Sequence, residues 1–147
     1  MFSEYITIKG DLDIEVFDEV TQTQTEKRHV KNLVVQVGKN FIASRMIQAS
    51  EPVMSHMAIG SGSLTPASSD TTLTTEVARV AITSATNADN VITYVAIFPA
   101  GTGTGPLTEA GIFNSDTAGS MLSHTTFAVV NKGANDTVSI TWSITVQ

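Results

Sequence analysis

Residues 137–146 read TVSITWSITV, and this stretch predicts a β-strand from its own pattern. Valine, isoleucine or tryptophan fills the even-numbered positions, and threonine or serine fills the odd-numbered ones. Because side chains on a strand point alternately to its two faces, one face is wholly apolar and the other carries only hydroxyl groups. A half-buried antiparallel strand has this pattern. Since the polar face offers no acid, base or metal ligand, the stretch is typical of a structural building block.

The composition sets broad limits on fold and partners. A chain of 147 residues suits a single domain, 1–147, with a real core, and without cysteine it forms no disulfide. The net charge is -6, from 14 acids and 8 lysines and arginines, which argues against nucleic acid and anionic membranes as partners. No apolar run is long enough to span a bilayer, and the N-terminal residues do not resemble a signal peptide.

Charge is spread unevenly along the chain. Beyond Arg79 the only cation is Lys132, and the few acids there are Asp89, Glu109, Asp116 and Asp136. Ordinary solvated surfaces are rich in charged residues. A surface of threonine, serine, alanine and glycine is typical of secreted adhesins and of proteins packed into large assemblies. We therefore favour a protein that works inside an assembly over a free β-domain with a neutral surface.

Turn residues recur every few residues between the apolar stretches. This spacing predicts a mostly β protein, an antiparallel β-sandwich or barrel-like domain of about seven to nine short strands. One short helix is expected from Leu33 to Gln48, capped by Asn32, although Gly38 weakens it by about 1 kcal/mol relative to alanine. The expected parts are an N-terminal β-ribbon or arm (1–31), the helical segment (32–50) and the β-sandwich core (54–147).

The N-terminal ribbon carries charge along its strands, as edge strands do. We therefore predict an interface arm that adds a strand to a neighbouring molecule. The residues assigned to this interface are Tyr5, Ile6, Ile8, Leu12, Ile14, Val16 and Phe17. Three carboxylates, Asp11, Asp13 and Glu15, share one face of the ribbon. They suit either a solvated edge, which we favour, or a Ca²⁺ ion.

Other candidate sites lack the partners that their chemistry needs. His29, His56 and His124 fall in three different predicted strands without the spacing of a metal site, which favours ordinary strand histidines. The glycine-rich stretch 101–105 lacks the lysine and the helix of a phosphate loop, and 60–63 lacks the Gly-x-Ser-x-Gly turn of a hydrolase. We therefore expect no catalytic residue, no cofactor and no metal, and a protein that is not an enzyme.

Glu109 is the acid that most needs an explanation. It lies in an otherwise apolar predicted strand, 107–113, where a carboxylate must be paired or hydrogen-bonded. Arg79 is the natural partner, so we predict a structural Arg79–Glu109 ion pair that ties two strands together. The alternative is a buried general acid, for which no second carboxylate is evident.

Several stretches together resemble a family of tailed-phage virion proteins. They are MAIGSG (57–62) followed by TLTTEVAR (72–79), FPAGTG (98–103) running into TEAGIFN (108–114), FAVVNK (127–132) with DTVSITW (136–142), and the opening KNLVV (31–35) with Gly38-Lys39. Their order is similar to that of the collar-type domain at the N-terminus of some phage tail fibres. This resemblance implies a virion location.

In tail fibres the collar-type domain leads into a long fibre, whereas this sequence ends at Gln147 directly after the last strand. We therefore expect a stand-alone structural subunit. The first hypothesis is a capsid decoration (cement) protein that binds the major capsid protein as an oligomer. The alternative is a tail-fibre or baseplate attachment (adaptor) protein with tail proteins as partners. A third hypothesis is a carbohydrate-binding β-sandwich, whose candidate stacking residues are Trp142, Tyr5 and Tyr94.

Overall fold

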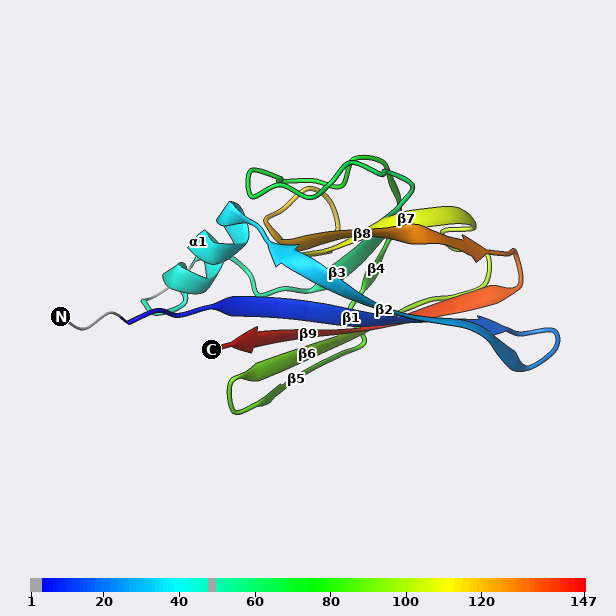
Figure 1. Ribbon diagram of the computed structural model, residues 1–147, viewed down its shortest axis with the longest axis horizontal. Helices are drawn as coiled ribbons and strands as arrows, with labels where there is room; N and C mark the ends of the chain where they lie inside the picture. The colour runs from blue at the N-terminus through cyan, green and yellow to red at the C-terminus, as the bar shows by residue number, and fades with distance from the viewer. Residues whose placement is uncertain (1–3, 48–49) are drawn as a thin grey trace.

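The computed structural model of the chain describes residues 4–47 and 50–147, and in this part the chain forms nine strands and one α-helix (Figure 1). In chain order they are β1 (Ile8–Asp18), β2 (Thr23–Val34), α1 (Gln36–Ser44), β3 (His56–Gly60), β4 (Glu76–Ala81), β5 (Ser84–Ala88), β6 (Val91–Phe98), β7 (Gly105–Phe113), β8 (Met121–Lys132) and β9 (Asp136–Val146). The predicted mostly β fold with one short helix is confirmed. No helix in the described residues is long and apolar enough to cross a membrane.

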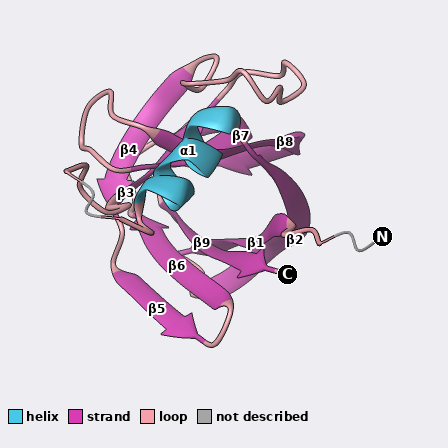
Figure 2. Cartoon of the chain, turned by 90° about the vertical axis from the view of Figure 1, so that its left-hand side faces the viewer, coloured by secondary structure: helices cyan, strands magenta, loops and turns pink. Residues whose placement is uncertain are grey.

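The strands form one antiparallel sheet in the order β4-β3-β7-β8-β2-β1-β9-β6-β5, which curls into a half-barrel (Figure 2). Strand β2 connects the two walls of the half-barrel. One wall is β4-β3-β7-β8 and the other is β1-β9-β6-β5. Most of it pairs with β1, and only its last residues, Leu33 and Val34, pair with β8. Farther along β2, the Arg28 guanidinium donates hydrogen bonds to two backbone carbonyls of β8, at 3.0 Å each. This side chain therefore spans the place where the walls separate.

The core lies inside the curled sheet, and β9 supplies one complete side of it. Val138, Ile140, Trp142 and Ile144 are buried, and the threonines and serines between them lie on the outer face. The alternation in TVSITWSITV therefore separates a buried face of β9 from an outer face, as the sequence predicts. Leu12, Ile14 and Val16 of β1 and Phe98 of β6 are buried in the same core.

Strand β1 lies in the middle of the sheet, which corrects the prediction that it forms an edge ribbon. It pairs with β2 on one side and with β9 on the other, from Ile8 opposite Val146 to Asp18 opposite Asp136. Its apolar residues fit the core of their own chain, and β9 satisfies its second row of backbone groups. The strands at the two ends of the sheet order are β4 and β5.

Helix α1 is shorter than the predicted 33–48. Leu33 and Val34 continue β2 because they pair with β8, so Asn32 lies within the strand and cannot cap the helix. Val35 occupies the N-cap position. The expected division between residues 31 and 32 therefore falls inside β2, and Gln48 lies outside the described residues.

Gly38 explains how the helix packs on the sheet. It is the buried residue of α1, and a Cβ atom there would overlap the carbonyl oxygen of Leu122 in β8. The residue that weakens the isolated helix therefore allows it to approach the sheet closely.

Candidate functional site

Glu109 of β7 is fully buried and accepts four hydrogen bonds. Its Oε1 atom accepts from the backbone N–H groups of Gly62 (3.1 Å) and Thr75 (2.7 Å). Its Oε2 atom accepts from the N–H of Thr74 (3.0 Å) and lies 3.0 Å from Nε2 of His124. The carboxylate thus fastens both ends of the 61–75 loop to the sheet.

His124 of β8 extends this contact into a chain of three ionisable groups. Its Nδ1 atom lies 2.8 Å from Oδ2 of Asp70, which belongs to the same loop. Ionised carboxylates only accept hydrogen bonds, so both ring nitrogens must carry a proton for both bonds to form. A His124 imidazolium between the carboxylates of Asp70 and Glu109 satisfies this arrangement.

Asp70 also has a backbone partner. Its Oδ2 atom accepts a hydrogen bond from the N–H of Ala67 at 2.8 Å. Burial by itself raises the pKa of Asp70, but the hydrogen bonds from Ala67 and His124, with the charge of His124, outweigh it and lower the pKa overall. The charged form of Asp70 is therefore the one that holds the middle of the loop.

Two glycines make room for the Glu109 carboxylate. Gly60 lies directly opposite Glu109 in the sheet, and a Cβ atom at Gly62 would come within 2.5 Å of Oε1. The absence of a side chain at Gly60 and Gly62 therefore leaves the space that the Glu109 carboxylate occupies. The sequence signals for this site, Asp70 in a polar loop and His124 in a predicted strand, are too weak to identify it alone.

Arg79 does not form the predicted ion pair with Glu109. Its guanidinium pairs with Glu76, at 2.7 and 3.0 Å, and lies 3.8 Å over the ring of Phe113. Its Nη1 atom donates to the backbone carbonyls of Ser115 (3.0 Å) and Ala118 (2.8 Å). Strand β3 lies between the strands that carry the two residues, and each side chain reaches a different loop.

Lys132, at the end of β8, is also buried and has a similar role. Its Nζ atom donates to the backbone carbonyls of Pro99 (2.9 Å) and Asp136 (2.6 Å). Burial lowers the pKa of Lys132, and the nearby Asp136 carboxylate partly opposes this. Glu109, Arg79 and Lys132 thus each fasten a loop to the sheet.

The acidic row on β1 lies opposite a basic row on β2. Asp11 faces Lys31, Asp13 faces His29 and Glu15 faces Lys27 in the strand register. The Asp13 carboxylate lies 2.7 Å from Nδ1 of His29, and the Glu15 carboxylate lies 3.6 Å from Nζ of Lys27. These cross-strand pairs support the solvated-surface interpretation. Within residues 4–47 and 50–147, no group of three or more histidine, aspartate or glutamate residues could hold a metal ion.

The remaining predicted site residues are scattered. Tyr5 and Ile6 are exposed, Ile8 and Phe17 are partly buried, and the other arm residues lie in the core. The ring of His56 contacts its neighbour Ser55, with Nδ1 2.8 Å from the hydroxyl oxygen. Trp142 is 0 % exposed, so it offers no face to a sugar. Burial raises the pKa of Tyr94, which is half-buried against the core.

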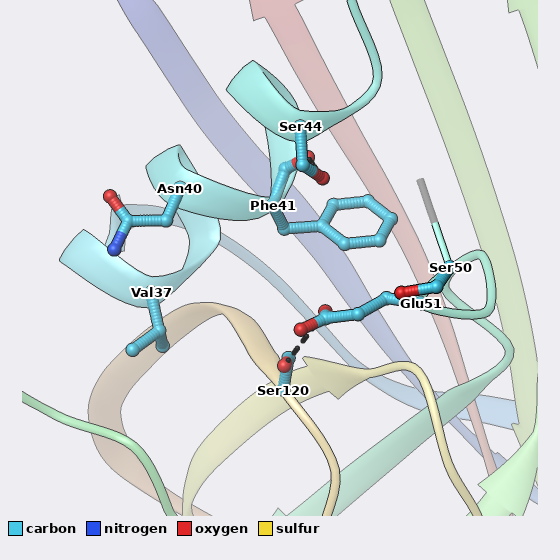
Figure 3. A pocket seen from close by; sticks show the side chains of 7 residues that line it. All are labelled: Val37, Asn40, Phe41, Ser44, Ser50, Glu51 and Ser120. Carbon is cyan, nitrogen blue, oxygen red and sulfur yellow. Dashed lines mark hydrogen bonds between the residues drawn. The ribbon is translucent and has the colours of Figure 1, made fainter. Parts of the chain in front are cut away.

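A hollow of about 330 Å³ lies between α1 and the 114–120 loop (Figure 3). Glu51 is the charged residue among the described residues that line it, and its carboxylate accepts a hydrogen bond from the Ser120 hydroxyl at 3.1 Å. Around it lie Val37, Asn40, Phe41 and Ser44 of the helix, with Ser50. The Glu51 carboxylate thus already has a hydrogen-bond partner within the protein.

Comparison with known families matches residues 27–146 to the family described as "Phage tail-collar fibre protein, N-terminal". The chain belongs to this family. The match begins within β2 and runs to the end of β9. The protein is a bacteriophage virion structural protein, so the resemblance and the virion location expected from the sequence are confirmed. Neither the curated proteins nor the solved structures gave a match.

Proposed function

We propose that the protein is an attachment (adaptor) module of the phage tail that links a tail fibre to other tail proteins and performs no catalysis. The observation that carries this proposal is the match of residues 27–146 to the tail-collar fibre family. Its partners are other proteins of the tail, and it acts there as an oligomer, as symmetric assemblies require.

The contacts of the buried and partly buried charged side chains support a structural role. Glu109 and His124 hold the 61–75 loop, Arg79 holds the 114–120 loop, and Lys132 holds the loop before β7 and the turn before β9. Buried ionisable groups of an active site face a substrate. Here each of these four side chains contacts the protein itself, and together they fasten the loops to the sheet.

The family favours the tail over the capsid. A capsid decoration protein would use the same neutral threonine- and serine-rich surface, so the surface alone does not separate the two locations. The matched family consists of tail-collar fibre proteins, which makes the tail role the better proposal. The carbohydrate-binding hypothesis loses its main candidate, because Trp142 is buried.

The test is a quantitative mass-spectrometric inventory of purified heads and purified tails from the same phage. We expect the chain in the tail fraction, at a small and fixed copy number relative to a known tail protein. The major capsid protein serves as the marker for contamination by heads. Recovery with the heads, in hundreds of copies per particle, would overturn the tail role in favour of capsid decoration.

A further inference from the structure

Three further hollows lie around helix α1, at the end of the molecule where β1 begins and β9 ends (Figure 1). Their volumes are about 200 Å³ between α1 and the sheet, about 430 Å³ beside Ile6 and Met46, and about 450 Å³ beside Lys9 and Lys31. The first two share Ile42, and the last two share Lys39. Neighbouring hollows thus share lining residues, and we call the three together the helix-end surface.

The helix-end surface exposes large apolar side chains. Met46 is 88 % exposed and Ile6 is 75 % exposed, and both line the same hollow as Ile42 of the helix. Nothing in the core of the described chain uses the side chains of Met46 and Ile6. Apolar side chains gathered around hollows mark a place where another molecule binds.

The charge of the helix-end surface is opposite to that of the whole protein. Lys9, Lys31, Lys39 and Arg45 line the three hollows, with Asp11 as the one acid among the described lining residues. These are half of the 8 lysines and arginines in a chain that has 14 acids. Such a concentration of positive charge selects a partner of negative charge.

We propose that the helix-end surface binds a segment of another tail protein in which apolar residues are flanked by aspartate or glutamate. The apolar side chains of that segment fill the hollows, and its carboxylates pair with Lys9, Lys31, Lys39 and Arg45. The location of the partner in the tail rests on the proposed function, whereas the chemistry of the partner rests on this surface alone.

A second copy of the chain related by a two-fold axis is a poorer occupant. Two copies that met across a two-fold axis would place the same basic surface against itself. Like charges brought together at an interface oppose binding. A foreign acidic segment avoids this repulsion and uses both the hollows and the cations.

The first experiment supplies variants of the full chain to a phage that lacks it and measures the protein per particle. We expect Lys39→Glu with Arg45→Glu, and separately Met46→Ser, to lower incorporation about tenfold or more. The matched controls are Lys27→Glu and Val20→Ser, which change an exposed lysine and an exposed apolar residue near the β1–β2 turn at the opposite end (Figure 1). Unchanged melting temperatures show that every variant folds. Incorporation equal to that of the controls would overturn the proposal.

The second experiment places a photo-crosslinking amino acid at position 46, or at position 20 as the control, during phage assembly. The expected product at position 46 is a peptide of another virion protein with apolar residues beside aspartate or glutamate. A crosslink to this same chain, to a segment without acids, or no more crosslinking than at position 20 would contradict the proposal. If the chain is found on heads instead of tails, the attachment function fails, and the crosslinked peptide still tests the chemistry of this surface.

Discussion

The Nε2 atom of His124 lies 3.0 Å from the Oε2 atom of Glu109, and both side chains are buried between the sheet and the 61–75 loop. Water does not reach this pair, so the strength of each hydrogen bond there depends on the protein groups around it. Three backbone N–H groups and Asp70 complete the set of partners. This cluster, rather than an ion pair to Arg79, compensates for the burial of Glu109.

Replacing Glu109 should unfold the protein more easily. Glu109→Gln keeps the shape but removes the charge that His124 and three backbone N–H groups contact, so we expect a loss of about 3 kcal/mol in the free energy of unfolding. Urea unfolding followed by circular dichroism measures this. The control is Glu15→Gln, which removes an exposed cross-strand pair and should cost less than about 1 kcal/mol. Equal effects of the two substitutions would show that the cluster has no special importance.

The stabilisation by Asp70 should disappear in acid. Its pKa is lower in the folded state than the value of about 3.9 in the unfolded chain, so the folded state binds fewer protons. Its contribution is therefore complete above the unfolded pKa and is lost as the pH falls through the folded pKa. We expect the difference in unfolding free energy between the natural chain and Asp70→Asn to shrink below about pH 4. Urea unfolding over a pH series checks this, and a difference independent of pH would contradict it.

A lysine at position 79 should not replace the arginine. Arg79→Lys loses the two-pronged contact with Glu76, the bonds to two loop carbonyls and the flat contact with Phe113. We expect thermal unfolding to show a loss of about 1–2 kcal/mol and faster hydrogen exchange in the 114–120 loop. Arg45→Lys, at an exposed arginine of the helix end, is the matched control and should change stability by less than about 0.5 kcal/mol.

Alanine at position 38 should destabilise the protein although alanine favours helices. Helix propensity alone predicts a gain of about 1 kcal/mol for Gly38→Ala. The added Cβ would overlap the carbonyl oxygen of Leu122, so we expect a net loss of about 1–3 kcal/mol instead. Chemical denaturation of this variant and of Lys39→Ala, at the exposed neighbouring position, tests the sign. A stabilised Gly38→Ala variant would mean that the helix does not press against β8.

Residue patterns predicted the helices and strands whose secondary structure depends only on the residues within the segment. The alternation of residues 137–146 defines an apolar face whichever strand lies beside it, so both the strand and its buried side chains follow from the sequence. The helix start was predicted too early because Leu33 and Val34 fit the apolar side of a helix as well as the end of a strand. Their pairing with His124 and Ser123 decides for the strand, and that contact is remote in sequence.

Partners that are distant in sequence were not predictable. The partner of Glu109 depends on how the 61–75 loop folds, and a polar loop has no periodicity that reveals its path. The place of β1 depends on β9, more than a hundred residues later, whose pairing turns Leu12 and Ile14 into core residues. The alternating sequence of a strand with charges on its outer face is the same whether the strand lies at the edge or in the middle of a sheet.

The position of β9 between β1 and β6 has a consequence for synthesis. On the ribosome, β1 and β2 are both made long before β9, so one side of β1 has no partner strand until β9 has been translated. Until then the nascent chain presents an unpaired backbone edge next to Leu12, Ile14 and Val16, a surface prone to aggregation. The half-barrel is thus completed only once β9 has been made, and Thr7 and Gln147 then exchange their two backbone hydrogen bonds of 2.7 Å.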